Sequence, residues 1–417
     1  MVDSRLLYLK KMKGNIIKAH GDKMLGSVRD IHLDLPRIST GSLSLDFGLG
    51  GGVSVGRCTL LRGPESSGKT YTAYMIAAEA QNLCANCLRR VSDLRVEERI
   101  DSGTGECEKY AIATCDCYNK GIFKPIQYKD EKKEEYKERL KGYEDNSYEE
   151  FRVALVDIEG GMDQEWASCI GVDLERMLYM RPDNAETAID IYDELLRTGA
   201  VDLIILDSIA LMSPSEEIEN SAVKQQQGLQ ARLMGKFTRK LAATISSASR
   251  EFGRLPTQVW INQEREKIGI MFGDNTVLPA GKAQLFYVSA IIKFWSSKWE
   301  KDNFNEGMIA EHEMSIGRRV RINFKLIKNK TGPSQTTGSY LLNVSGENKG
   351  KIDEVKFVVA QAERFGLYRV EKDGAKKKYW VGDEEYKTAK AAQERMTEPF
   401  TFAELKKMIL EKMLGAR

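Results

Sequence analysis

Residues 58–81 read CTLLRGPESSGKTYTAYMIAAEAQ, an apolar run, a glycine-containing loop and a second apolar run. The first run, 58–63, is short and apolar, as a buried strand is, and YTAYMIAAEAQ has the length and composition of a helix. The loop between them matches the pattern G-x-x-x-x-G-K-[ST]. The stretch therefore predicts a strand, a tight loop and a helix, which is the repeating unit of α/β folds.

This loop has the residue types that a phosphate site needs. Its glycines let the backbone curl so that successive N–H groups point inward, and the N-terminus of the following helix adds its dipole. A lysine at position 69 is expected to reach the β- and γ-phosphates of ATP, and the Thr70 hydroxyl to ligate Mg²⁺. A chance match is the alternative, which the flanking strand and helix disfavour. The expected ATP-binding loop consists of Gly63, Pro64, Glu65, Ser66, Ser67, Gly68, Lys69 and Thr70.

The alternation of strand and helix patterns continues along the chain, and it predicts a mostly parallel sheet with helices on both faces. Further strands are expected at 152–157, 201–207, 257–262, 289–295 and 318–328, and helices at 161–170, 185–198 and 227–247.

Two acidic residues follow these strands at the edge where open α/β sheets bind their ligands. Asp207 ends VDLIILD, and an acid there is suited to hold Mg²⁺ together with Thr70. Glu159 lies just past VALVD and is a candidate base for the attacking water. Either acid alone would more often be a helix cap or a solvated residue, but their shared position beside the loop favours catalysis.

The chain divides into four regions. Residues 1–36 form an N-terminal amphipathic helix and linker, 37–83 and 151–341 the α/β core, and 342–417 a small α+β C-terminal domain rich in Lys and Glu. Residues 84–150 are an inserted module, because about 70 residues replace a connection that usually takes about 2 to 6.

The insert carries five of the seven cysteines. Two close pairs, Cys84 with Cys87 and Cys115 with Cys117, predict a zinc-ribbon-like thiolate site that would fold a segment poor in apolar residues, with Cys107 as a substitute ligand. Reduced cysteines or a redox pair remain the alternative. The module should leave the sheet at the edge opposite the ATP site, so a partner-binding, DNA-binding or regulatory role is expected, and not a catalytic one. Cys58 and Cys169 lie in apolar elements and are expected in the core.

Overall composition excludes some classes of protein. Hydrophobic residues make up 42% and charged residues 30%, the balance of a globular chain. A net charge of only +2 means that any DNA-binding surface must be local. No apolar run approaches the roughly 20 residues of a membrane-spanning helix, and the N-terminus lacks a signal-peptide core, so we expect a cytoplasmic protein with no membrane partner.

Six motifs follow one another along the chain: ISTGSLSLDFGLGGG (38–52), GPESSGKT (63–70), VDIEGGMD (156–163), GAVDLIILDSIAL (199–211), INQEREKIGIMFG (261–273) and LIKNK (326–330). In this order and spacing they resemble the bacterial RecA recombinase family. The resemblance implies a filament of protomers on single-stranded DNA, with ATP bound between neighbours, which pairs that DNA with a homologous duplex and exchanges strands in recombination and repair. The N-terminal helix would pack on the next protomer.

The resemblance also implies roles for residues of the ATP site. Glu159 would be the catalytic glutamate, and Gln263 would sense the γ-phosphate and signal to a DNA loop beside it. Lys328 and Lys330 would reach into the neighbour's ATP and supply positive charge to the transition state. Asp163 and Trp166 would lie at the adenine, although ordinary core packing is the alternative for Trp166.

Two segments resemble the family's DNA loops. They are ENSAVKQQQ (219–227), with Lys224, and EREKIGIMFGDNTVLPAG (264–281). Basic side chains there would contact phosphates, and an apolar residue would separate stacked bases. A solvated mobile loop is the alternative, and both loops depart in composition from the family. The expected DNA-binding residues are Lys224, Arg239, Arg265, Lys267, Ile268 and Gly269.

Three other functions share parts of this pattern. A hexameric helicase with the same core is disfavoured by the KNK pair, the second loop and the N-terminal helix. An ATPase that remodels recombination intermediates can carry a zinc module, but usually ahead of the core. An ATP-gated scaffold without hydrolysis is disfavoured by the presence of Lys69, Glu159 and Asp207.

Overall fold

The computed structural model of the chain describes most of the core and the C-terminal region. Apart from a few positions between 11 and 18 and between 132 and 137, the described residues are 35–90, 94–100, 107–113, 150–215, 228–252, 255–266, 276–297, 319–332, 334, 336–373 and 376–415. No helix among them is long and apolar enough to cross a membrane. The expected N-terminal helix and linker, 1–36, fall almost wholly outside these ranges.

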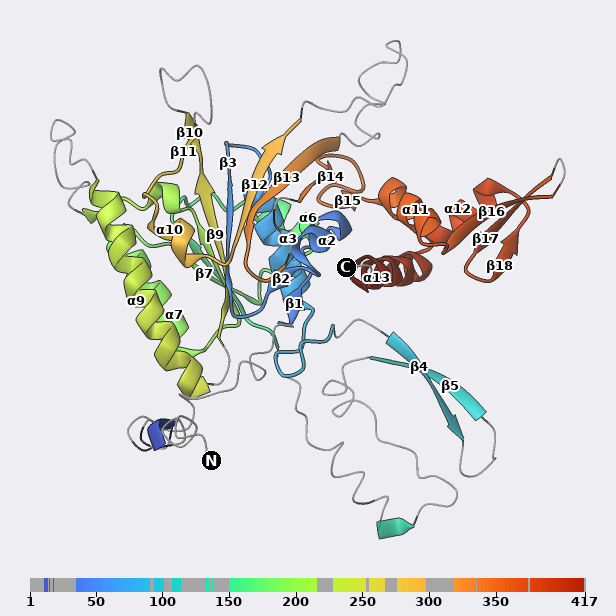
Figure 1. Cartoon of the computed structure of the whole chain (residues 1–417), viewed down its shortest axis with the longest axis horizontal. Coiled ribbons are helices and arrows are strands. Elements are labelled where there is room, and N and C mark those ends of the chain that lie inside the picture. Colours follow the sequence, from blue (N-terminus) through green and yellow to red (C-terminus); the bar gives the residue numbers. More distant parts are fainter. Residues whose placement is uncertain are drawn as a thin grey trace, which may run out of the picture.

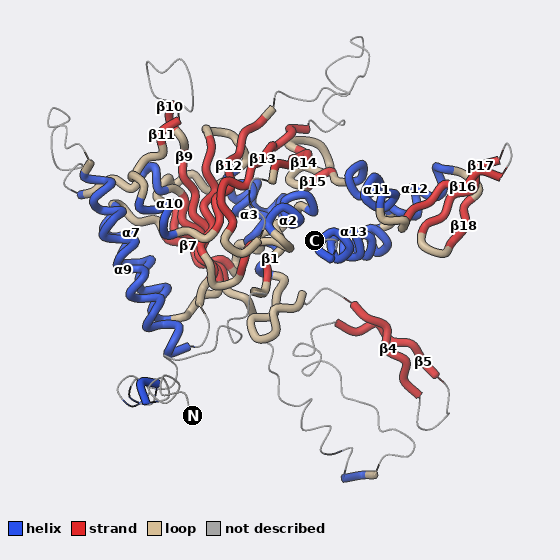
Figure 2. Tube along the Cα trace, viewed as in Figure 1, coloured by secondary structure: helices blue, strands red, loops and turns tan. Residues whose placement is uncertain are grey.

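A nine-stranded sheet forms the centre of the molecule (Figures 1 and 2), in the order β15-β14-β13-β12-β3-β9-β8-β6-β7. The strands from β12 to β7 are parallel, whereas β13, β14 and β15 pair antiparallel at one edge. Their bounds are β3 Cys58–Gly63, β6 Val153–Asp157, β7 Met177–Met180, β8 Leu203–Asp207, β9 Thr257–Gln263, β12 Ala290–Ser296, β13 Arg319–Asn329, β14 Thr337–Asn343 and β15 Ile352–Asp353. The expected mostly parallel α/β sheet is confirmed.

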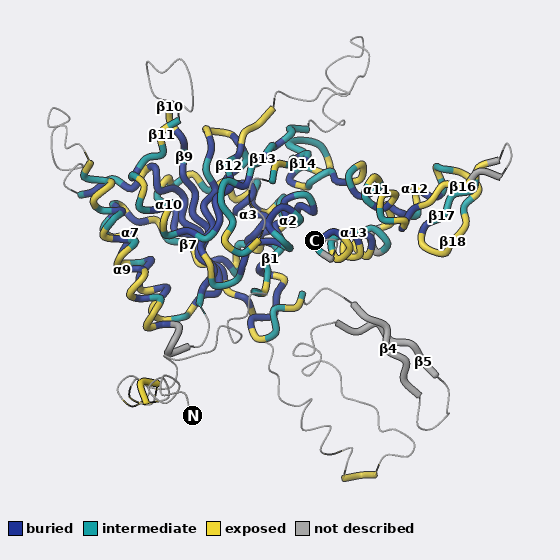
Figure 3. Tube along the Cα trace, viewed as in Figure 1, coloured by how far each residue is buried: buried dark blue, intermediate teal, exposed yellow. Residues whose placement is uncertain are grey.

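Helices cover both faces of this sheet, because its strands present apolar side chains to each side in turn. Leu203 and Ile205 of β8 enter one core cluster, and Ile204 and Leu206 enter the other. Strands β6 and β8 are buried along their whole length, and β3 and β9 at all but one residue each (Figure 3). The first cluster includes helices α2 (Leu43–Leu49), α3 (Lys69–Gln81) and α6 (Gln164–Ile170), and the second α7 (Ala185–Thr198), α9 (Leu229–Phe252) and α10 (Ala283–Tyr287).

Several short elements connect these layers. They are β1 (Arg37–Ile38) paired with β2 (Val53–Ser54), the 3₁₀ turn η3 (Ile209–Leu211), and β10 (Arg265–Glu266) paired with β11 (Thr276–Val277). Within the insert, β4 (Leu94–Ile100) and β5 (Cys107–Ala113) form an antiparallel hairpin. An isolated bridge between Cys84 and Glu150 brings the two ends of the insert together.

The C-terminal region has its own apolar cluster and a small antiparallel sheet. The boundary expected after residue 341 falls within β14, since the central sheet continues to Asp353. The elements of this region are α11 (Val355–Arg364), β16 (Tyr368–Asp373), β17 (Lys376–Val381), β18 (Glu384–Tyr386), α12 (Ala389–Thr397) and α13 (Pro399–Gly415).

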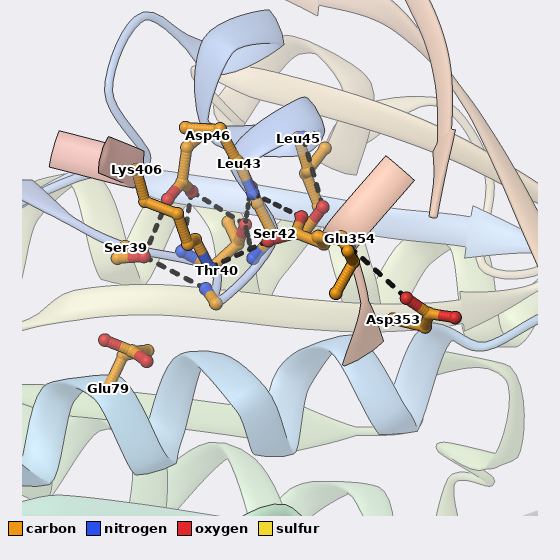
Figure 4. A network of polar contacts seen from close by, with 12 residues as sticks. Ser39, Thr40, Ser42, Leu43, Leu45, Asp46, Glu79, Asp353, Glu354 and Lys406 are labelled. Atoms are coloured by element: carbon orange, nitrogen blue, oxygen red, sulfur yellow. Dashed lines mark hydrogen bonds and ion pairs between the residues drawn. The ribbon is translucent and has the colours of Figure 1, made fainter. Parts of the chain in front are cut away.

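Buried polar groups join this region to α2 (Figure 4). Lys406 of α13 lies 2.7 Å from Glu354, whose other carboxylate oxygen accepts from the Leu43 N–H at 2.6 Å. Asp46, one turn further along α2, accepts from Thr40 and Ser39. Its burial raises the pKa of the Asp46 carboxyl to about 7.

Candidate functional site

The loop from Gly63 to Thr70 joins the end of β3 to the start of α3, where the sequence placed it. Two glycines permit its path. Gly68 has φ +91°, a conformation that L side chains rarely adopt. A Cβ at Gly63 would lie 2.4 Å from the carbonyl oxygen of Phe294 on β12. The loop is therefore packed against the neighbouring strand, which leaves no room for a larger residue at its first position.

Lys69 is buried at the first turn of α3. Its ammonium donates to the carbonyl oxygen of Pro64, and the Ser67 hydroxyl donates to the same oxygen at 2.8 Å. Desolvation lowers the pKa of the Lys69 ammonium, and the negative charges of Asp207, Glu159 and Glu264 oppose this effect. The ammonium thus lies inside the curl of the loop, where it faces the position that a phosphate would take.

Asp207 ends β8 and is buried beside the loop. Its Oδ2 accepts a hydrogen bond of 2.9 Å from the Thr70 hydroxyl. Burial raises the pKa of the Asp207 carboxyl to about 7, a rise that the Thr70 hydrogen bond opposes and that Glu159 and Asp157 reinforce. Its Oδ1 is buried without a hydrogen-bond partner in the described part of the chain. A hydroxyl beside a carboxylate that keeps one oxygen unsatisfied is a pair of oxygen ligands that fits a Mg²⁺ ion.

Asp157 is a site residue that the sequence analysis missed. It ends β6 directly opposite Asp207 in the parallel register. It is buried and accepts from the Gly160 N–H at 2.7 Å and from the Tyr179 hydroxyl at 3.0 Å. These bonds fix the turn that carries Glu159, which is exposed. The signal was present, because VALVD ends in aspartate just as LIILD does.

Gln263 lies at the end of β9, opposite Gly63 in the register with β3. The N–H of the next residue, Glu264, donates to the Gly63 carbonyl oxygen at 2.9 Å. The start of the second expected DNA loop is therefore hydrogen-bonded to the first residue of the phosphate loop.

Lys328 and Lys330 lie near the amino ends of the parallel strands, whereas the phosphate loop follows the carboxyl end of β3. Lys328 pairs with Ile291 near the start of β12, and the start of β12 pairs with Thr59 of β3. Thr59 precedes Gly63 by four residues, about 13 Å along a strand. The Lys328 ammonium donates to the Leu285 carbonyl oxygen at 2.6 Å, and burial and the charge of Lys330 lower the pKa of Lys328. Lys330 follows β13, with its N–H bonded to Ser289 just before β12, so both lysines lie at the far end of the strands from the loop of their own chain.

The two residues expected at the adenine lie on α6. Asp163 caps this helix by accepting from the Trp166 N–H at 2.9 Å. Trp166 is half-buried, with its ring centroid 6.0 Å from that of Tyr71 and the Lys349 ammonium 5.5 Å above it. Because Tyr71 follows Thr70, the tryptophan lies beside the helix that follows the loop. Contact with adenine stays a prediction.

Only two of the expected DNA-binding residues are described. Arg239 is exposed on α9, and Arg265 is exposed on β10, where it pairs with Val277. The remaining four, Lys224, Lys267, Ile268 and Gly269, lie outside the described residues.

The expected zinc ligands are described only in part. Cys84 is buried in a turn in which its backbone N–H donates to Arg89 and its carbonyl accepts from Leu88. Cys87 is half-buried in the same turn, and Cys107 begins β5. Cys115 and Cys117 fall outside the described ranges. Within those ranges, no group of three or more His, Cys, Asp or Glu side chains is placed to hold a metal. Cys58 is buried in the core as expected, and Cys169 is half-buried.

Comparisons with known proteins agree with this geometry. The RecA N-terminal domain model matches residues 8–97 and 145–344, and the gap between the two segments lies inside the expected insert. Protein RecA of Clostridium acetobutylicum is 32% identical over 359 residues, which are 85% of this chain and 77% of that protein. Protein RecA of Haemophilus ducreyi is 30% identical over 344 residues, 82% of this chain and 68% of that protein.

Proposed function

Because the chain belongs to the RecA family, we propose that it is an ATP-dependent recombinase that assembles as a filament on single-stranded DNA. In this proposal it pairs the bound strand with a homologous duplex and exchanges strands. Members of the family are DNA-dependent ATPases, and the ATP-binding loop of this chain is intact.

One observation carries the proposal: the chain separates its phosphate loop from Lys328 and Lys330. The lysines lie at the amino ends of the parallel strands and the loop lies at their carboxyl ends, so a single chain cannot bring them together. A neighbour in a head-to-tail row would place its lysines at the loop of the next chain, which is the heterologous contact that builds helical filaments. Phe286 supports such a contact, because it is 78% exposed and adjoins Leu285, the Lys328 acceptor.

The residues of the site divide the work of hydrolysis. Lys69 and the N–H groups of the loop hold the phosphates, and Glu159, on the turn fixed by Asp157, polarises the attacking water. A bound Mg²⁺ would neutralise phosphate charge, and Thr70 and Asp207 would hold it. The lysines of the neighbour supply charge to the transition state. Asp163 and Trp166 are proposed at the adenine.

The DNA surface is proposed along the carboxyl edge of the sheet, at the 219–227 and 264–281 segments. Arg265 is an exposed cation at the stem of the second segment, and Arg239 is an exposed cation on α9, the helix that follows the first segment. Lys224 and Lys267 would add further phosphate contacts. Ile268 and Gly269 would lie between bases. Gln263, beside Gly63, connects this surface to the nucleotide.

For the insert we propose a structural zinc site. The turn at Cys84–Cys87 fits the first half of a four-thiolate site, with Cys115 and Cys117 as the second half and Cys107 as a substitute. The bridge between Cys84 and Glu150 separates the module from the sheet. We therefore assign it to an accessory partner, extra DNA contact or regulation.

Electron microscopy of the chain with single-stranded DNA and a non-hydrolysable ATP analogue tests the proposal. Open helical filaments are expected, together with ATP hydrolysis that depends on DNA. Closed rings would favour a hexameric helicase, and hydrolysis unaffected by DNA would contradict the recombinase.

A further inference from the structure

A buried ionic cluster lies between the phosphate loop and the second proposed DNA loop. The Glu264 side chain is only 3% exposed, with one carboxylate oxygen 2.9 Å from Arg62 Nε and the other 3.2 Å from Lys293 Nζ. Arg62 and Lys293 have no role in the function proposed above, and Glu264 enters it only as the first residue of the 264–281 segment.

The cluster ties three strands together. Arg62 lies on β3 and Lys293 lies opposite it on β12, whereas Glu264 follows β9 on the other side of β3. The Glu264 N–H also donates to the Gly63 carbonyl oxygen. Backbone and side chain of one residue therefore both hold the start of the DNA loop to the strand that leads into the phosphate loop.

The returning end of the same loop is held by a second buried contact. Asn262, two residues before Glu264, donates to the Pro279 carbonyl oxygen at 3.2 Å and to Gln284 at 2.8 Å. Gln284 donates to Pro279 and Gly281. Both ends of the 264–281 segment are thus fixed to β9 by polar side chains around Gln263.

The ion pairs of Glu264 are better suited to fix the positions of the three strands than to stabilise the fold. Removing a carboxylate and two cations from water is costly, and a well-packed apolar residue often stabilises as well or better. An ionic cluster, in contrast, has few alternative arrangements, so it fixes the strands relative to one another. Glu264 lies between Gln263, which is opposite Gly63, and Arg265, which begins the loop stem, so the cluster holds both neighbours in place.

We infer that Glu264 is a positioning residue that couples the nucleotide state to the DNA-binding state of the 264–281 segment through Arg62 and Lys293. This inference rests on the proposed function. It predicts that Glu264 contributes to the mutual strengthening of nucleotide and DNA binding, and not to the binding of either one alone.

Glu264→Gln tests this, because it removes the charge and keeps the shape. The affinity for a single-stranded oligonucleotide is measured with and without a non-hydrolysable ATP analogue, and the affinity for the analogue with and without DNA. In the wild type each ligand should tighten the other, by a factor that typically lies between about 5 and 150. In E264Q both factors should collapse toward one together, because coupling between two binding sites is reciprocal. Each affinity measured alone should stay close to that of the wild type.

Glu354→Gln is the matched control, since Glu354 is a buried carboxylate paired with Lys406 far from the DNA loop. It should lose thermal stability as E264Q does, yet keep the coupling factor. The double variant E264Q/K293M removes one of the two cations left unpaired. It should regain stability without regaining coupling.

The outcomes separate the two ideas. If, in the wild type, neither ligand changes the affinity for the other, both the proposed function and this inference are overturned. Wild-type coupling that survives in E264Q would overturn the inference alone, as would coupling restored in E264Q/K293M. The inference also fails if E264Q and E354Q lose coupling equally.

Discussion

The Thr70 hydroxyl donates a hydrogen bond of 2.9 Å to Asp207, which joins the first turn of α3 to the end of β8. A threonine and an aspartate 137 positions apart in the chain thereby lie at one point beside Lys69. The second Asp207 oxygen is left buried without a hydrogen-bond partner among the described residues. These are the groups to which we assign the Mg²⁺ ion of the proposed ATP site.

Asp207→Asn should reduce ATP hydrolysis by about 100- to 1,000-fold, since it removes one negative charge from the cation site. The amide oxygen can still accept from Thr70, so the fold should be retained. Hydrolysis rates measured over a Mg²⁺ titration should show a weaker apparent affinity for Mg²⁺. Thr70→Ser keeps the hydroxyl and should behave almost as the wild type. A wild-type Mg²⁺ dependence in D207N would contradict this assignment.

Mixing two inactive variants should restore hydrolysis if the lysines act on the neighbour. Lys69→Ala removes the phosphate lysine, and the double variant K328A/K330A removes the neighbour's cations. In an equimolar mixture on DNA, about one interface in four joins an intact loop to intact lysines, because the contact is head to tail. Hydrolysis should therefore return to about a quarter of the wild-type rate.

The matched control uses both defects in one chain. K69A/K328A/K330A mixed with K69A has no intact loop at any interface, so it should stay inactive. Restored activity in this control, or none in the first mixture, would exclude sharing of the site between chains.

The stability of the chain should fall as pH rises, because of Asp46. Burial raises the pKa of this carboxyl from 3.8 to about 7. Between these values the folded chain keeps a proton that the unfolded chain has lost, so unfolding becomes easier with rising pH, by up to about 4 kcal/mol. Denaturant unfolding at pH 5 and pH 8 should differ by about 3 kcal/mol on account of Asp46 alone, which is the part of this change that lies above pH 5.

Asp46→Asn should reduce this pH dependence and leave the share of Asp207, because burial also raises the pKa of the Asp207 carboxyl to about 7. The fold should be kept, since the amide oxygen can accept from Thr40 and the amide N–H can donate to the Ser39 hydroxyl. Asp190→Asn is a control, since Asp190 is an exposed carboxylate on α7 and should leave the dependence intact. An equal slope in D46N and the wild type would assign it to other groups.

Zinc content tests the proposed site in the insert. The purified chain should carry about one zinc ion, measured by elemental analysis, and C84S/C87S should lose it. Cys169→Ser should keep the metal, because Cys169 lies on α6. A metal-free wild type, or zinc retained in C84S/C87S, would overturn the site.

The sequence predicted the centre of the sheet well and its edges poorly. Buried parallel strands such as LIILD are continuous apolar runs, and α7 occupies 185–198 as expected. By contrast β7 is short and half exposed, and β14 and β15 lie in a polar stretch whose pairing depends on β13. Their strand character arises from neighbours that the local pattern does not reveal.

The site was predictable where one residue type has one chemical use. Thr70 and Asp207 are hydrogen-bonded, and Gln263 lies opposite Gly63 of the phosphate loop, whereas their roles in hydrolysis stay predictions. Glu264 could not be foreseen, because EREK suggests a solvated loop, and only the register of β12 against β3 brings Lys293 and Arg62 to it. For Trp166 the sequence allowed either adenine stacking or core packing, and the structure shows its ring beside that of Tyr71.

The bridge between Cys84 and Glu150 has a consequence for how this chain can be altered. The polypeptide leaves the core and returns to it at adjacent positions. The core therefore has the same structure at this junction whatever the length of the segment between them. Lengthening such an excursion costs little, since closure entropy grows only slowly with loop length. The junction is thus a natural grafting point, where a reporter domain could replace the module without disturbing the sheet.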